Sequence, residues 1–274
     1  MSEDTYRRDG ELEGVLQQVS SQLRASLGNI HRALDKLAPP ERRDADPDVD
    51  YHAALLCQSY YRILRLADNL ADAVDLDAPG AARLTNGDIA GLCREVMERA
   101  EQPAELLGLR LAFQCGKKSH IIEMDSARLE RLLLNLLSNA FKFTPKGGLV
   151  SLEVRLDPQN VVLSLSDTGC GIAPELLETV FDRYRFTQRL DPPPHGLGLG
   201  LPICRRIARE HGGSLLLTSR EGEGTTVTVS LPNRRSAGAA MRTYVVELGG
   251  GYNRTLVELS DALPRQAFAQ KFLD

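Results

Sequence analysis

The chain has 274 residues, of which 42% are hydrophobic and 26% charged, and its formal net charge is -4. This balance is typical of one or two folded domains and excludes a chain that is disordered throughout. Lysine and arginine are mixed with a slight excess of aspartate and glutamate rather than clustered, which excludes the basic footprint of a nucleic-acid-binding protein.

Two long amphipathic helices are expected first, over residues 1–80. Apolar residues recur at spacings of three, four or seven, which places them on one stripe of each helix. The first stripe comprises Leu12, Leu16, Val19, Leu23, Ile30, Leu34 and Leu37, and the second Leu56, Tyr60, Ile63, Ala67, Leu70 and Val74. Pro39 and Pro40 separate the helices, so they should form an antiparallel hairpin. The stripes exceed what one hairpin buries and favour a four-helix bundle in a homodimer; packing on the chain's own C-terminal domain is the alternative.

Alternating helices and strands are expected over residues 84–233. The helices are predicted near residues 87–101, 125–143, 173–181 and 200–211, and the strands near 110–114, 119–123, 149–156, 161–166, 214–219 and 225–231. The fold class is therefore α+β, with the helical hairpin followed by an α/β sandwich that has helices on one face of a mixed sheet.

The C-terminal segment, residues 241–274, is predicted to be an extension made of a strand, a glycine turn and a helix. Its helix carries an apolar face formed by Leu256, Val257, Leu259 and Leu263. This face is expected to dock on the α/β sandwich.

A polar edge marks the apolar helix at 125–143. Asn135, Asn139 and Lys142 are spaced i, i+4 and i+7, so they lie on one side of the helix. An asparagine oxygen can bind Mg²⁺ beside a triphosphate, and a lysine can neutralise phosphate charge. A solvent-facing edge is the alternative.

Asp167 ends a predicted strand and is followed by Gly169 and Gly171. Glycines permit a close backbone approach to a flat ligand, and a carboxylate there can accept a hydrogen bond from the adenine amino group. The alternative is a common Asp-Thr-Gly turn at a strand end.

A string of glycines, Gly196, Gly198 and Gly200, directly precedes the helix at 200–211. Backbone N–H groups at a helix N-terminus bind phosphate, although the string alone is also compatible with a flexible loop. Gly222, Gly224 and Thr225 then lead into the last strand, as in an ordinary hairpin turn.

In this order and spacing, the motifs NxxxNxxK, DTGxGI, FDRY, GLGLGL and GEGTT resemble the ATP-binding domain of sensor histidine kinases over about residues 84–232. The resemblance implies a Bergerat-type fold with ATP and Mg²⁺ as cofactors and residues 182–195 as a lid. In the ATP site that this resemblance implies, Asn139 binds the metal, Lys142 contacts phosphate and Asp167 recognises adenine. The implied binding set is Asn135, Asn139, Lys142, Asp167, Gly169, Gly171, Gly196, Gly198, Gly200 and Thr225. Related hydrolytic ATPases carry a glutamate base where Asn135 stands, so hydrolysis-driven clamp action is not expected.

The hairpin resembles the dimerisation and phosphoacceptor domain of the same family, but its chemical positions differ. Ser21 replaces the phosphoacceptor histidine and Gln22 the neighbouring acidic base, while Ala25 and Ser26 replace a threonine and a proline. A serine hydroxyl needs a base that glutamine cannot supply, so conventional self-phosphorylation is expected to be lost. Ser21 as a true acceptor stays the alternative, because related folds include protein-serine kinases. His31 and His52 are expected to be surface or packing residues.

Two functions remain open. One is a histidine-kinase-like enzyme that phosphorylates itself unconventionally, or a partner, and feeds a response regulator. The other is a non-catalytic, ATP-binding dimeric regulator that docks on a partner. The absence of an apolar run of about 18 to 20 residues and the five scattered cysteines favour a cytoplasmic protein without a membrane span. About ten residues precede the first helical pattern, so a sensor domain is not expected there.

Overall fold

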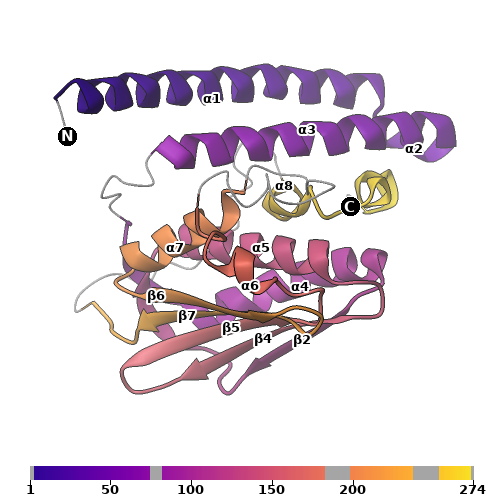
Figure 1. Ribbon diagram of the computed structural model, residues 1–274. Helices are drawn as coiled ribbons and strands as arrows, with labels where there is room; N and C mark the ends of the chain where they lie inside the picture. The colour runs from indigo at the N-terminus through magenta and orange to yellow at the C-terminus, as the bar shows by residue number, and fades with distance from the viewer. Residues whose placement is uncertain (1–2, 75–81, 183–197, 237–252, 273–274) are drawn as a thin grey trace. The chain divides into compact units, whose positions relative to one another are not determined.

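The computed structural model describes residues 3–74, 82–182, 198–236 and 253–272. These residues form two compact units, one comprising Met1–Ala78 with Leu263–Asp274 and the other Pro79–Ala262. The first unit is helical and the second combines a sheet with helices (Figure 1). The expected α+β class, with N-terminal helices followed by a domain built on a sheet, is confirmed.

The first unit is built on an antiparallel pair of helices, α1 (Glu3–Leu37) and α3 (Pro47–Val74), joined by the short α2 (Pro40–Ala45) (Figure 1). Pro40 occupies the first turn of α2, where its missing N–H has no helical partner to lose. Ser20 on α1 is buried and donates its hydroxyl hydrogen to the Ala67 carbonyl on α3 at 2.7 Å. Arg24 adds an ion pair with Asp68 at 3.0 Å.

The two faces of the hairpin differ in burial. Leu27, Leu34, Tyr60, Leu64 and Ala67 are buried. We use the name outer stripe for the large apolar side chains that stay exposed, namely Val15, Val19, Leu23, Ile30, Leu37, Leu55, Leu56, Ile63 and Leu66. Several residues of the predicted stripes therefore point to solvent in the single chain, because helical periodicity identifies a face without identifying what covers it.

The end of the chain packs on this hairpin. Two 3-10 helices, η3 (Arg265–Phe268) and η4 (Gln270–Phe272), follow Pro264. Arg43 donates to the Phe268 carbonyl at 2.7 Å, and Gln58 donates to the Leu263 carbonyl at 2.9 Å. The extension expected over residues 241–274 is thus divided between the two units at Ala262. The strand expected at 243–248 lies outside the described residues.

The second unit contains a five-stranded mixed sheet in the order β2-β4-β5-β7-β6. Its strands are β2 (Arg110–Cys115), β4 (Leu149–Leu156), β5 (Asn160–Asp167), β6 (Ser214–Arg220) and β7 (Gly224–Pro232). β2 is parallel to β4, and the other pairs are antiparallel, including the expected β4–β5 hairpin. Alternate side chains, such as Val150, Leu152 and Val154 on β4, are buried, so one face of the sheet carries the core.

Helices α4 (Ile89–Leu107), α5 (Ser126–Phe143) and α7 (Gly200–Glu210) cover that face (Figure 1). Asp88 and Asp125 cap the first two by accepting from the N–H groups of Gly91 and Arg128. The helix expected at 173–181 is confined to α6 (Pro174–Leu177), and α8 (Arg254–Leu259) packs on α5.

A two-stranded sheet that the sequence did not predict joins β1 (Thr85–Asp88) to β3 (Ile121–Met124). The β1 sequence Thr-Asn-Gly-Asp consists mainly of turn-forming residues. Its extended conformation therefore depends on the pairing with β3 rather than on local propensity.

Candidate functional site

The polar edge of α5 faces the start of α7. Asn135 is fully buried, whereas Asn139 and Lys142 are partly exposed. Gly200 is the first residue of α7, and a Cβ atom there would lie 3.2 Å from Asn135 Oδ1 and 3.9 Å from Asn139 Nδ2. Two of the predicted asparagines thus lie beside the end of the glycine string. Gly198 has a left-handed φ of 69°, and Gly196 and most of the expected lid lie outside the described residues.

Asp167 stands at the end of β5, where β7 begins alongside it. Its Oδ1 accepts hydrogen bonds from Gly169 N at 2.8 Å and from Thr225 N at 3.3 Å. Burial raises the pKa of Asp167 above its usual value, against the lowering effect of these two backbone donors. The structure therefore brings together Asp167, Gly169 and Thr225, which the sequence predicted from separate motifs.

The glycines near Asp167 are required by close backbone contacts. A Cβ on Gly171, at a φ of 67°, would lie 2.0 Å from the Arg220 carbonyl oxygen. A Cβ on Gly224, at a φ of 108°, would lie 2.0 Å from the Asp167 carbonyl oxygen. The close approach that the sequence suggested is thus an approach of protein backbone to protein backbone, and contact of these glycines with a ligand stays a prediction.

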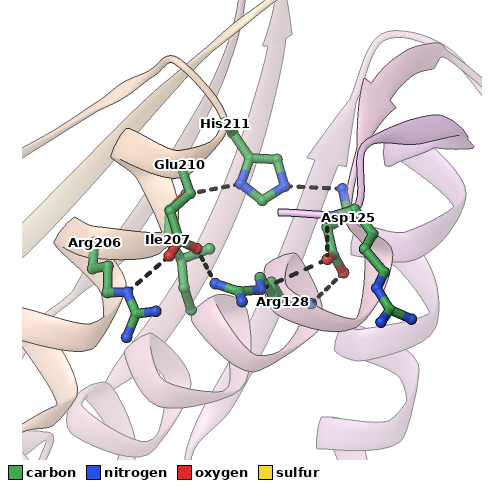
Figure 2. A network of polar contacts seen from close by, with 7 residues as sticks. Asp125, Arg128, Arg206, Ile207, Glu210 and His211 are labelled. Atoms are coloured by element: carbon green, nitrogen blue, oxygen red, sulfur yellow. Dashed lines mark hydrogen bonds and ion pairs between the residues drawn. The ribbon is translucent and has the colours of Figure 1, made fainter. Parts of the chain in front are cut away.

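A polar network holds the N-terminus of α5 against the C-terminus of α7 (Figure 2). His211 donates from Nδ1 to the Ile207 carbonyl at 2.8 Å and accepts at Nε2 from Asp125 N at 2.9 Å. Burial lowers the pKa of His211, which keeps the ring neutral so that Nε2 can accept. Glu210 pairs with Arg206 at 2.8 Å and also with Arg128. These contacts fix the spacing of α5 and α7 and so keep Gly200 beside Asn135.

The predicted site also has contacts that the sequence patterns did not reveal. Asn135 Nδ2 lies 3.2 Å from Glu258 Oε2, a carboxylate supplied by α8. Arg131, one helical turn before Asn135, pairs with Glu258 at 3.2 Å between Nε and Oε1. The sequence does show a charged residue within each of two apolar helices, Arg131 in α5 and Glu258 in α8. A charged residue alone, however, does not reveal which residue it pairs with.

Ser21 and Gln22 lie apart from these residues in sequence, on α1 of the first unit, and both are exposed. Their neighbour Ser20 is the buried one. His31 lies 3.0 Å from Asp35 and packs on Tyr60 with ring centroids 4.8 Å apart, and His52 packs on Tyr51. The two histidines pack on aromatic rings, which agrees with the surface or packing role expected for them.

Comparisons with known proteins agree with this architecture. A family model described as histidine kinase-, DNA gyrase B-, and HSP90-like ATPase matches residues 124–235. Sensor protein SrrB of Staphylococcus aureus strain MRSA252 is 35% identical over 191 residues, which are 68% of this chain and 32% of SrrB. The SrrB of strain N315 is 33% identical over 217 residues, 78% of this chain and 37% of that protein. The chain therefore spans about a third of the length of these relatives.

Among solved structures, full-length ShkA in complex with AMPPNP is similar, with a TM-score of 0.65 and 27% identity over 83% of this chain and 47% of ShkA. AdeS of Acinetobacter baumannii, at a TM-score of 0.51 and 19% identity over 65% of this chain and 84% of that one, shares the fold. None of the helices that the structure describes has both the length and the apolar composition needed to cross a bilayer. Through its ATPase domain, the chain belongs to the sensor histidine kinase family.

Proposed function

We propose that this protein binds MgATP in the unit Pro79–Ala262 and acts in two-component signalling as a histidine-kinase-like protein without the usual phosphoacceptor. A cytoplasmic location and a response regulator as partner belong to the same proposal. The observation that carries it is the placement of Asp167 at a strand end, with Oδ1 held by two backbone N–H groups. Among the described contacts, Oδ2 is left to accept from a ligand. Support also comes from ShkA, a structural neighbour that was solved with AMPPNP.

Each part of the nucleotide has a chemically suitable group. Asp167 can accept from the adenine amino group, which guanine lacks at that position. The N-terminal N–H groups of α7 favour the phosphates. Asn139 offers a neutral oxygen to Mg²⁺, and Lys142 offers a positive charge to phosphate. The magnesium ion, when bound, would neutralise phosphate charge.

The Asp167→Ala variant should bind ATP more weakly by about 1.5 to 3 kcal/mol, because it loses a hydrogen bond to a charged acceptor. Isothermal titration calorimetry with MgATP measures this difference. Asp157→Ala is the matched control, since Asp157 is an exposed aspartate in the turn between β4 and β5. Equal ATP affinities for wild type and Asp167→Ala would overturn the assignment of Asp167.

We further propose that the outer stripe joins two copies of the chain in a four-helix bundle. Ile30 and Leu23 on this stripe are 53% and 38% exposed, which is costly for a lone hairpin. The wild type should be a dimer at micromolar concentration, and Ile30→Glu should raise its dissociation constant at least about tenfold by placing a charge in the seam. Light scattering over a concentration series measures this constant.

Ala25→Glu provides the control, because Ala25 is exposed on another side of α1 and the change adds the same charge. It should leave the dimer intact. A wild-type chain that is monomeric at micromolar concentration would refute the bundle and favour the alternative packing of the stripe.

A further inference from the structure

Helix α8 is held on α5 by two charge pairs of opposite sense. Glu130 on α5 is 1% exposed and accepts from Arg254 of α8 at 3.1 Å, as well as from Arg99 of α4 at 2.5 Å. The next residue, Arg131, pairs with Glu258 of α8 at 3.2 Å. Buried charges need partners, so these complementary pairs fix the register of α8 on α5.

The contact between α8 and α5 also determines the orientation of the Asn135 carboxamide. Its Nδ2 donates to the Arg131 carbonyl at 3.0 Å and to Glu258 Oε2 at 3.2 Å. An amide nitrogen carries two hydrogens, and each has an acceptor here. The reversed orientation would place the amide oxygen against a carbonyl and a carboxylate, which repel it. Oδ1 must therefore point the other way, toward Gly200 at the start of α7.

We propose that Glu258 is a positioning residue of the nucleotide site, which makes nucleotide binding depend on magnesium. It holds Nδ2 of Asn135, and the amide oxygen consequently faces the helix N-terminus where phosphate is expected. An oxygen acceptor there repels bare phosphate oxygens but is compatible with a cation or its bound water. A released carboxamide can rotate and present N–H groups to phosphate instead. This inference rests on the proposed ATP site.

The measured quantity is the ratio of two ATP affinities of the full chain, one with excess Mg²⁺ and one in EDTA, both by calorimetry. In Glu258→Ala this ratio should fall about tenfold, as expected for the loss of one hydrogen bond to a charged acceptor. Glu258→Gln keeps an oxygen that accepts from Asn135 and should retain the wild-type ratio, although it loses the ion pair with Arg131.

Glu258→Asp supplies a second variant in case the alanine variant does not fold. It keeps the charge opposite Arg131, but its side chain is one methylene shorter, so it should lose contact with Asn135 and lower the ratio. Arg254→Ala is the control, since it breaks the other α5–α8 pair without touching Asn135. Its ratio should stay at the wild-type value even if its melting temperature falls.

The outcomes separate the two proposals. The positioning role would be overturned if the ratio depended on the charge at position 258. In that case Glu258→Asp would have the wild-type ratio, and Glu258→Gln would have the ratio of Glu258→Ala. So would an equal fall of the ratio in Glu258→Ala and Arg254→Ala, which is the result of a purely structural contact. ATP binding by wild type with an unchanged ratio in Glu258→Ala would overturn this inference and leave the proposed function intact. Failure of wild type to bind ATP would instead overturn the proposed function and this inference with it.

Discussion

The wild-type chain incubated with γ-labelled ATP and Mg²⁺ should incorporate phosphate at least about 100-fold more slowly than the Ser21→His/Gln22→Glu variant. A serine hydroxyl without a base is a poor nucleophile, and Gln22 cannot take its proton. The double substitution supplies both an imidazole and a carboxylate. Ser21 and Gln22 are exposed, so their replacement leaves the buried bond from Ser20 to the Ala67 carbonyl in place.

The single variant Ser21→His is the control, because it restores the nucleophile without its acidic neighbour and should be labelled more slowly than the double variant. Label in the double variant should be acid-labile, as expected for phosphohistidine. Rapid labelling of wild type, mapped by mass spectrometry to Ser21, His31 or His52, would contradict the loss of the acceptor. Of these, His31 has a carboxylate within reach, Asp35 at 3.0 Å. ATP binding without label in any variant would favour the non-catalytic docking regulator.

Local patterns predicted most of the second unit well. The leucines of α5 and the alternating residues of β4 and β5 gave their elements within a residue or two of the observed bounds. The strand-end position of Asp167 was also predictable. Its contact with Thr225 N follows from the β5–β7 pairing, which places two distant motifs opposite each other. These parts of the fold and the site were predictable because their signals lie within a few consecutive residues. Such signals are the alternation of apolar residues along a strand and a glycine directly before a helix.

Long-range partners were not predictable in the same way. No local signal in Thr-Asn-Gly-Asp reveals that β1 pairs with β3. Glu130 and Glu258 each stand in an apolar helix, and their partners Arg254 and Arg131 are more than a hundred residues away. Charge alone allows many such pairings, and only packing selects one. On α1, one step of about 100° around the helix separates buried Ser20 from exposed Ser21. Periodicity predicted the exposure of Ser21, but neither the burial of Ser20 nor what covers the outer stripe.

The Gly171→Ala variant should destabilise the second unit by at least about 2 kcal/mol, because backbone strain and overpacking each cost roughly 1 to 3 kcal/mol. Gly171 has a φ of 67°, and the added methyl carbon would lie 2.0 Å from the Arg220 carbonyl oxygen. The added methyl group would clash with backbone atoms, which cannot turn aside as a flexible side chain can. The segment that follows Asp167 must therefore move away from the end of β6. The bond from Gly169 N to Asp167 Oδ1 lies in that segment, and ATP affinity should fall together with stability.

Gly222→Ala separates the two causes of the loss. Gly222 also has a positive φ, 79°, but a Cβ there would meet nothing within 4 Å. Its substitution should therefore cost the strain alone, about 1 kcal/mol, and leave ATP affinity near the wild-type value. Urea unfolding and calorimetry on both variants give the comparison. Equal destabilisation by the two substitutions would mean that the Arg220 carbonyl can move aside at little cost, and that Asp167 is not held in place by this backbone contact.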